Sequence, residues 1–248
     1  YDPLGQLTSA LYTEKSGSSW TSNASGKYDL SGLTYDLNGN LKSLRRNNST
    51  GVALHKLLYT YGSSNNGNAI SRITLNEKTS SLYAYDGNGN LVNDGRLGVT
   101  IQYNELALPC KIKKGTKEVL YVYSANGEKL AQQVADAVIY YRGVMVYQGN
   151  VLDYITYSDG FARNNSNGYG YNYMLRDHLG STRVLLEANG NSLAPVQTTE
   201  YYPFGLAFTY NNLNKSKYLF SGKELQDISF DSNILGWYDF GARLYDPV

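Results

Sequence analysis

The sequence has few of the residues on which disulfide-bonded, metal-dependent or catalytic domains depend. Cys110 is the only cysteine among 248 residues, so no disulfide can form within the chain. The only two histidines, His55 and His178, are far from Cys110 and from each other, without the spacing of a zinc site. We therefore expect no metal and no cofactor, and a fold that depends on packing and backbone pairing.

The chain also lacks an excess of charge and a long apolar run. It has 22 Lys and Arg against 21 Asp and Glu, a net charge of +1. A nucleic-acid-binding protein usually has a basic excess or stripe, so we expect no nucleic-acid partner. No apolar run reaches the roughly 18 residues of a membrane span. The chain opens at Tyr1 without Met or a signal-peptide pattern, which suggests a fragment or a processed piece.

Tyrosine, glycine and asparagine are abundant instead, with 25 of each. Tyrosine favours strands, whereas asparagine and glycine favour the tight turns between strands. The aromatic content also argues against disorder. Composition alone predicts an all-β protein with many turns.

A short motif, Tyr-Asp-x-x-Gly-x-Leu, recurs at irregular intervals in the first half of the chain. A copy opens the chain, looser copies lie near residues 103 and 123, and the clearest two comprise Tyr35, Asp36, Gly39, Leu41, Tyr85, Asp86, Gly89 and Leu91. The aspartate can bond its own backbone, and Asn-Gly supplies the positive φ angles of a two-residue hairpin turn. We therefore predict stacked hairpins.

Other local patterns predict further elements. Strands are expected at residues 137–147, 152–157, 171–175 and 182–187, where apolar and polar residues alternate. Exposed loops are expected at residues 45–50, 62–68 and 160–170, which are polar and rich in glycine or asparagine. A short helical turn near residues 223–227 is the one exception to an all-β pattern.

A denser set of motifs fills the second half of the chain. In order, they contain Arg176, Asp177, His178, Gly180, Ser181, Thr182, Arg183, then Pro203, Phe204, Gly205, then Gly222, Lys223, Glu224, and finally Tyr238, Gly241, Arg243, Tyr245, Asp246 and Pro247. These motifs and their order resemble the core region of bacterial Rhs/YD-repeat proteins. The resemblance implies an all-β strip of YD-repeat hairpins, coiled into a partial shell or barrel-like sheet and capped by the Rhs-associated core. It divides the chain into repeat hairpins at residues 1–150 and a core at 151–248, within one continuous sheet.

The same resemblance implies a function. From it we expect this chain to be a non-enzymatic scaffold, secreted or at the bacterial cell surface, that carries, shields or presents a partner polypeptide, as in toxin delivery. Many members cleave their own chain through aspartates and an upstream arginine. Asp246 and Arg243 match the front of that motif, but the chain ends at Val248 before the rest of it. We therefore do not expect this chain to cleave itself.

Three other functions stay open. The first is an extracellular adhesion or carbohydrate-binding module, which would show exposed tyrosine clusters. The second is an aspartyl protease that cleaves its own chain once, and the third is a passenger bound to a secretion channel.

Two sets of residues invite a catalytic interpretation. Asp177, His178 and Ser181 suggest a hydrolase, but neighbours on a strand point to opposite faces, so a turn is the better interpretation. The carboxylates of residues 227, 231 and 239 suggest a glycosidase, but nothing in the sequence fixes their separation. Solvated turn residues are the favoured interpretation of these three.

Overall fold

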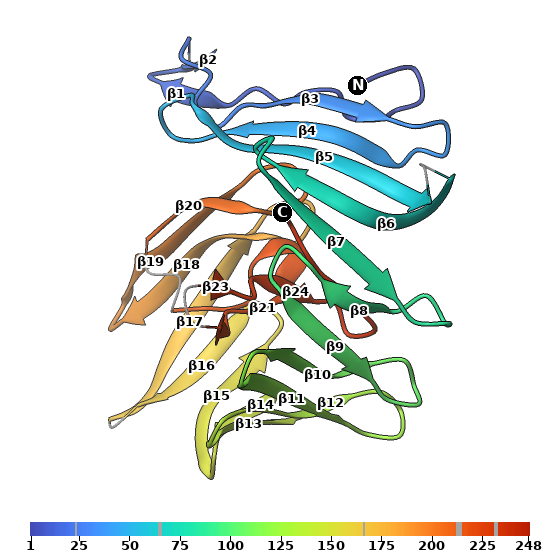
Figure 1. Cartoon of the computed structure of the whole chain (residues 1–248). Coiled ribbons are helices and arrows are strands. Elements are labelled where there is room, and N and C mark those ends of the chain that lie inside the picture. Colours follow the sequence, from blue (N-terminus) through green and yellow to red (C-terminus); the bar gives the residue numbers. More distant parts are fainter. Residues whose placement is uncertain (23, 64–65, 166, 212–214, 231–232) are drawn as a thin grey trace. The chain divides into compact units, whose positions relative to one another are not determined.

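The computed structural model describes residues 1–248 except 23, 64–65, 166, 212–214 and 231–232. The regular secondary structure of the described chain is almost entirely strand (Figure 1), and the chain forms two compact units, residues 1–98 and 99–248. Each unit is built from consecutive hairpins in antiparallel sheets, as predicted. Across the described ranges, no helix is long and apolar enough to span a membrane.

Unit 1 contains a separate hairpin and one sheet. The hairpin is β1 (Thr13–Ser16) with β2 (Ser19–Ser22). In the sheet each strand pairs with the next: β3 (Leu30–Tyr35), β4 (Leu41–Asn47), β5 (Ala53–Ser63), β6 (Asn66–Leu75), β7 (Thr79–Tyr85) and β8 (Leu91–Asp94).

Unit 2 contains a longer sheet of the same kind and a C-terminal segment. The sheet runs in chain order through β9 (Val99–Tyr103), β10 (Pro109–Lys114), β11 (Lys117–Tyr123), β12 (Lys129–Val134), β13 (Ala137–Arg142), β14 (Met145–Gln148), β15 (Val151–Tyr157), β16 (Gly160–Asn165), β17 (Gly168–Arg176), β18 (Thr182–Asn189), β19 (Ser192–Tyr201) and β20 (Ala207–Asn211). The segment contains the 3₁₀ turn η1 (Phe220–Gly222), β21 (Glu224–Gln226), β22 (Ser229–Phe230), β23 (Asn233–Ile234), β24 (Trp237–Asp239) and β25 (Leu244–Tyr245).

The sequence predicts a boundary near residue 150 between the repeat hairpins and the core motifs, and this boundary stays a prediction. Strands β14 and β15, on either side of that position, pair with each other in one sheet.

The repeated motif forms a three-residue hairpin loop rather than the two-residue turn expected from Asn-Gly. In the copy at Asp86, the Asp86 N–H donates to Asn90 O (2.9 Å) and the Gly89 N–H donates to Asp86 O (3.1 Å). Only Gly89 takes a positive φ, of 83°. The register shifts by one residue beside the loop, between Ala84 and Tyr85, as in a loop that ends in a left-handed residue and a bulge.

The aspartate completes this loop as predicted. Asp86 Oδ1 accepts the N–H groups of Asn88 (2.9 Å) and Asn90 (2.8 Å). The side-chain amide of Asn90, followed by these backbone N–H groups, holds the pKa of Asp86 below its usual value. The same pair of backbone bonds closes the loops at residues 2–6, 36–40, 48–52, 104–108, 124–128, 177–181, 202–206 and 219–223. The last three loops belong to motifs of the core region, so the repeats and the core use the same type of turn.

The left-handed glycine of this loop can be tested against a second glycine beside it. Gly89→Ala should lower the free energy of unfolding by about 1–2 kcal/mol, because a Cβ disfavours the left-handed backbone. Gly87→Ala is the matched control, since Gly87 has no positive φ and open space where a Cβ would lie. Urea denaturation of both variants measures the difference, and equal stability of the two would contradict the turn geometry.

Four of the local predictions were wrong in whole or in part. Residues 160–170, expected as a loop, form most of the hairpin of β16 and β17, and residues 45–47, expected as part of a loop, end β4. The expected strand at 137–147 is the hairpin of β13 and β14. The helical turn expected near 223–227 is strand β21, because its residues pair with β24. The loop at 62–68 is shorter than expected, with β5 and β6 entering it, and residues 64–65 lie outside the described residues.

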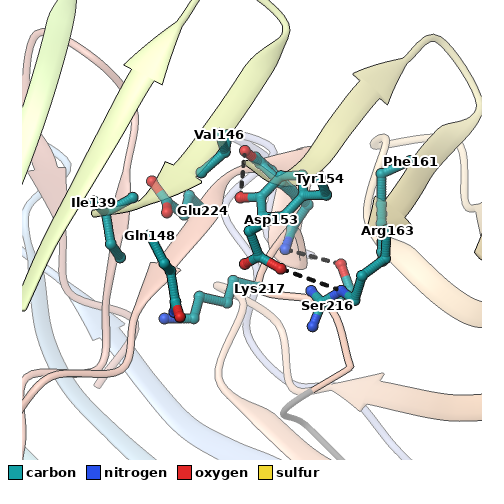
Figure 2. Close-up of a pocket in the computed structure, with 11 residues that line it drawn as sticks. Ile139, Val146, Gln148, Asp153, Tyr154, Phe161, Arg163, Ser216, Lys217 and Glu224 are labelled. Carbon is teal, nitrogen blue, oxygen red and sulfur yellow. Dashed lines mark hydrogen bonds and ion pairs between the residues drawn. The ribbon is translucent and has the colours of Figure 1, made fainter. Parts of the chain in front are cut away.

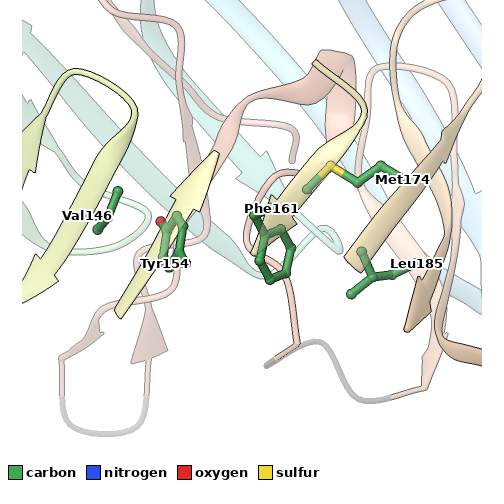
Figure 3. Close-up of a cluster of buried hydrophobic side chains, with 5 residues drawn as sticks. All are labelled: Val146, Tyr154, Phe161, Met174 and Leu185. Atoms are coloured by element: carbon green, nitrogen blue, oxygen red, sulfur yellow. The ribbon is translucent and has the colours of Figure 1, made fainter. Parts of the chain in front are cut away.

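The core of unit 2 lies on one face of its sheet, which we call the inner face. Five successive strands, β14 to β18, each contribute one buried side chain to it: Val146, Tyr154, Phe161, Met174 and Leu185 (Figure 3). Strand alternation places the neighbours of these residues on the opposite, outer face.

Unit 1 buries a group of basic side chains. Arg46 in β4 is 1% exposed and pairs directly with His55 in β5. Burial, followed by the charges of Arg46 and Arg96, lowers the pKa of His55 from 6.5 to about 4. The folded protein therefore holds His55 neutral.

This burial predicts a loss of stability in acid. Between pH 6.5 and about 4 the unfolded chain protonates His55 and the folded chain does not, so the free energy of unfolding falls as the pH drops through that window. His55→Gln should flatten this dependence, whereas the exposed His178, changed to Gln, should leave it intact. Urea denaturation across the window is the measurement, and an unchanged slope in His55→Gln would refute the assignment.

Candidate functional site

The sheet of unit 2 wraps around the end of its own chain. Described residues of the C-terminal segment, defined as residues 216–248, contact the inner face at several points. Tyr121 in β11 donates to Gln226 (3.0 Å), and the hydroxyls of Tyr154 in β15 and Tyr218 lie 3.3 Å apart. Further along the sheet, the N–H of Thr182 at the start of β18 donates to Leu219 O (3.0 Å). Strands from β11 to β18 thus meet one segment, so the sheet curves around it.

A buried ionic cluster fixes this segment to the sheet. Glu224 and Asp239 are directly paired residues of β21 and β24, so their carboxylates lie on one face of that pair. Lys129 at the start of β12 places its Nζ 2.6 Å from a carboxylate oxygen of each. Tyr141 in β13 donates to the other oxygen of Glu224 (2.9 Å), and the Lys129 ammonium lies 4.4 Å from the Tyr141 ring centre. We call these four side chains the Lys129 cluster.

The electrostatics of the cluster favour the charged lysine and the neutral tyrosine. Burial alone would lower the pKa of Lys129, but the charges and hydrogen bonds of Glu224 and Asp239 outweigh it, so the pKa is raised. Burial, then the charge of Glu224, raises the pKa of Tyr141 well above its usual range. The two carboxylates share one ammonium and one hydroxyl, so the cluster neutralises charge that would otherwise repel.

A cavity of about 150 Å³ opens beside the cluster (Figure 2). It lies between the inner face and the C-terminal segment, and Glu224 is one of its lining residues. Its lining combines apolar, aromatic and charged groups: Ile139, Val146, Gln148, Asp153, Tyr154, Phe161, Arg163, Ser216, Lys217, Tyr218 and Glu224. Arg163 lies 3.9 Å from Asp153, and Lys217 lies 2.7 Å from Asp227, so both lining cations have an acidic partner.

The core motifs named in the sequence come together around an aromatic group in the segment. Phe220 stacks on Tyr245 (6.0 Å between ring centres) and contacts Tyr238 (5.8 Å). The hydroxyl of Tyr238 donates to Gly205 O (3.2 Å), and that of Tyr245 to Phe204 O (2.8 Å). A Cβ at Gly205 would lie 2.5 Å from the Phe220 ring, so only glycine allows this contact.

The motif at residues 176–183 is a turn with a charged flank. Asp177 Oδ1 accepts the N–H groups of Leu179 (3.0 Å) and Ser181 (2.9 Å). Buried Ser181 accepts the N–H of Ser221 (3.1 Å), and Arg183 pairs with Glu200 and, at 3.8 Å, with Asp177. These contacts give structural partners to Asp177 and Ser181, two of the three polar residues of the suspected hydrolase.

Three other motif residues lie at the edge of this arrangement. His178 is exposed in the turn, and Arg176 donates to Ser158 O (2.7 Å). Lys223 lies over the Phe240 ring, 5.4 Å from its centre.

The residues suggested for self-cleavage lie at the end of the segment. Arg243 is exposed, and its carbonyl accepts the Phe240 N–H (3.0 Å) in the turn that contains Gly241. Asp246 is half-buried, accepts the Val248 N–H (3.0 Å) and precedes the buried Pro247. Their catalytic role stays a prediction.

Sequence reasoning missed the Lys129 cluster. Asp239 was assigned to a solvated turn, but its side chain is 11% exposed and paired with Lys129. Asp227 is exposed as expected, and residue 231 lies outside the described residues. The only local signal for the cluster is that Glu224 and Asp239 lie at equivalent positions of two short strands. Their shared partner, Lys129, lies 95 and 110 residues away in the sequence.

Comparisons with known proteins bear on the fold. Three solved structures match the whole chain, each at TM-score 0.55. They are TcdB2-TccC3-Cdc42 at 14% sequence identity, TcdB2-TccC3 at 15%, and TcdB2-TccC3 without its hypervariable C-terminal region at 15%. The chain spans 15% of the length of each. At this identity the likeness concerns the fold alone. No protein-family model and no curated protein matches the chain.

The Lys129 cluster can be tested by removing its cation. Lys129→Met keeps most of the aliphatic stem but leaves two buried carboxylates uncompensated, so the free energy of unfolding should fall by about 3–5 kcal/mol. Lys217→Met breaks the exposed pair with Asp227 in the same segment and should cost less than about 1 kcal/mol. Urea denaturation gives the stabilities, and hydrogen exchange at residues 216–248 should rise in Lys129→Met alone. Equal effects of the two substitutions would mean that the cluster does not anchor the segment.

Proposed function

We propose that this chain is part of an Rhs-type scaffold that carries and shields a partner polypeptide. The observation that carries the proposal is the inner face of unit 2, which curves around residues 216–248 and holds them through the Lys129 cluster and the aromatic contacts of Phe220. A surface that already covers a polypeptide on several strands is suited to sequester one. The shell fold shared with TcdB2-TccC3 supports the same function.

The proposal includes a place and a partner. The scaffold acts outside the cytoplasm, secreted or at the cell surface, and its partner is a polypeptide joined to the C-terminal end or enclosed with it. Folding by packing and backbone pairing suits either location, since the lone Cys110 cannot form an internal disulfide. The direct anchoring of the C-terminal segment supports a partner near that end.

The test uses the full native gene product that contains these residues, purified from its natural host. We expect one defined polypeptide to remain with the scaffold and to resist thermolysin while the scaffold is folded. The same polypeptide, expressed alone, is the control and should be digested at once. After urea unfolding of the complex, the polypeptide should be digested like the control.

Two outcomes would count against the scaffold. Purification without any partner polypeptide would overturn it, as would digestion of the partner at the rate of the free control. Native Asp246→Asn gene product addresses self-cleavage separately: if Asp246 takes part, intact-mass measurement should find a single longer chain in place of two pieces.

A further inference from the structure

The Lys129 cluster places an amine and two carboxyl groups within hydrogen-bonding distance in a buried position. Lys129 Nζ lies 2.6 Å from Asp239 Oδ2 and 2.6 Å from Glu224 Oε2. The three side chains are 13%, 11% and 10% exposed, respectively. One carboxylate is enough to pair with a lysine. The second adds an acceptor for the lysine proton, and a lysine amine becomes a nucleophile when a base beside it takes that proton.

The two carboxylates are held in different ways. Asp239 Oδ2 faces Lys129, while Asp239 Oδ1 accepts the N–H of Gly241 (2.8 Å). A backbone N–H at that oxygen stabilises the oxyanion that forms when an amine adds to the carboxyl carbon. Glu224 faces Lys129 through Oε2 and accepts the Tyr141 hydroxyl (2.9 Å) through Oε1. This geometry suits Asp239 to be attacked and Glu224 to accept a proton.

The surroundings are aromatic and favour a neutral product. The Tyr141 ring centre lies 4.4 Å from Lys129 Nζ, and Tyr121 is 4% exposed. Burial, and to a lesser extent the charge of Asp239, raises the pKa of both Tyr121 and Tyr123. Charges are costly in such a place, whereas a neutral amide costs little. Exclusion of water also hinders the hydrolysis of an amide once it has formed.

We propose that Lys129 and Asp239 join through an isopeptide bond, with Glu224 as the general base. Glu224 takes a proton from the Lys129 ammonium, and the neutral Nζ adds to the carboxyl carbon Cγ of Asp239. The bond between Nζ and Cγ forms, and the bond between Cγ and Oδ2 breaks. The nitrogen gives up two protons in all, the first by way of Glu224, and both leave with Oδ2 as one molecule of water. Glu224 ends unchanged and the charges of Lys129 and Asp239 disappear together, so atoms and charge balance without a further reactant.

The reaction depends on proximity more than on a reactive lysine. The raised pKa of Lys129 keeps most of its amine protonated, so the bond forms slowly and once in the life of each chain. Holding the two groups in contact replaces a bimolecular encounter, an advantage equal to an effective concentration of about 10⁵–10⁸ M. An amine and a carboxylate that do not condense in dilute solution can therefore do so here.

The bond would fix the C-terminal segment to the sheet permanently. It joins β12 to β24 between residues 110 positions apart, and so closes a long loop of chain. A closed loop has less conformational entropy to gain on unfolding, which stabilises the folded state. The cover of the inner face could then not detach. This inference goes beyond the proposed scaffold and does not depend on it, since the bond forms whether or not a partner polypeptide is carried.

Mass spectrometry of the whole chain, unfolded in urea, tests the proposal. The intact mass should be lower than the sequence mass by one water molecule, and digestion should yield a branched peptide that joins residues 129 and 239. Lys129→Arg keeps the charge but not the amine and should restore the sequence mass. Glu224→Gln keeps both joined residues and should slow the reaction about a hundredfold or more, leaving most chains unlinked. Asp239→Asn should still link, with loss of ammonia in place of water.

The matched control is Lys27→Arg. Lys27 Nζ also lies 2.6 Å from a carboxylate oxygen, that of Glu14, but this pair is more exposed, so the loss of water should persist in the variant. Three results would overturn the proposal: a wild-type chain with the full sequence mass, a water loss that maps to residues other than 129 and 239, or equal linkage in folded Glu224→Gln. The first two need only the wild-type chain, so they decide the question even if a variant fails to fold.

Discussion

An antiparallel sheet built from successive hairpins has two faces, and apolar residues on one face need a cover. In unit 2 the cover is the end of the same chain. Val146, Tyr154 and Phe161 would be exposed on a free sheet, but the C-terminal segment lies against that face. The segment brings two carboxylates with it, and Lys129 has to neutralise both. Curvature, core and ionic cluster all follow from that requirement.

The turns explain why the sequence was informative about architecture. Asp86, Gly89 and their counterparts act within five residues, so a local pattern identifies them without knowledge of the fold. The predicted two-residue turn was still wrong. The aspartate and a single left-handed glycine are enough to close a three-residue loop. Asn88, the asparagine of the Asn-Gly pair, does not take a positive φ in this loop.

The contacts that define the site could not be read in the same way. Glu224 and Asp239 become neighbours only when β21 pairs with β24, and Lys129 reaches them from a distant hairpin. The polar composition of residues 160–170 suggested solvent, yet backbone pairing made a hairpin of them. Across this hairpin the Tyr157 hydroxyl on β15 donates to the carbonyl of Asn172 on β17, a contact that joins three strands and that no local pattern shows. Residues such as Asp246 and Arg243 were named from motif resemblance, and their chemistry awaits experiment.

The shared loop also bears on how such a chain can change in length. Each loop is closed by bonds between its own residues, so the pairing of one hairpin is set without reference to the next. Adding or deleting a pair of strands would leave the side chains of every other strand on their original faces. The irregular intervals between the motif copies fit this arrangement, because hairpins of unequal length follow one another within the sheet of each unit. The sheet is therefore extensible: an ancestral strip could grow by duplication of hairpins, while the C-terminal segment needs only the strands that it touches.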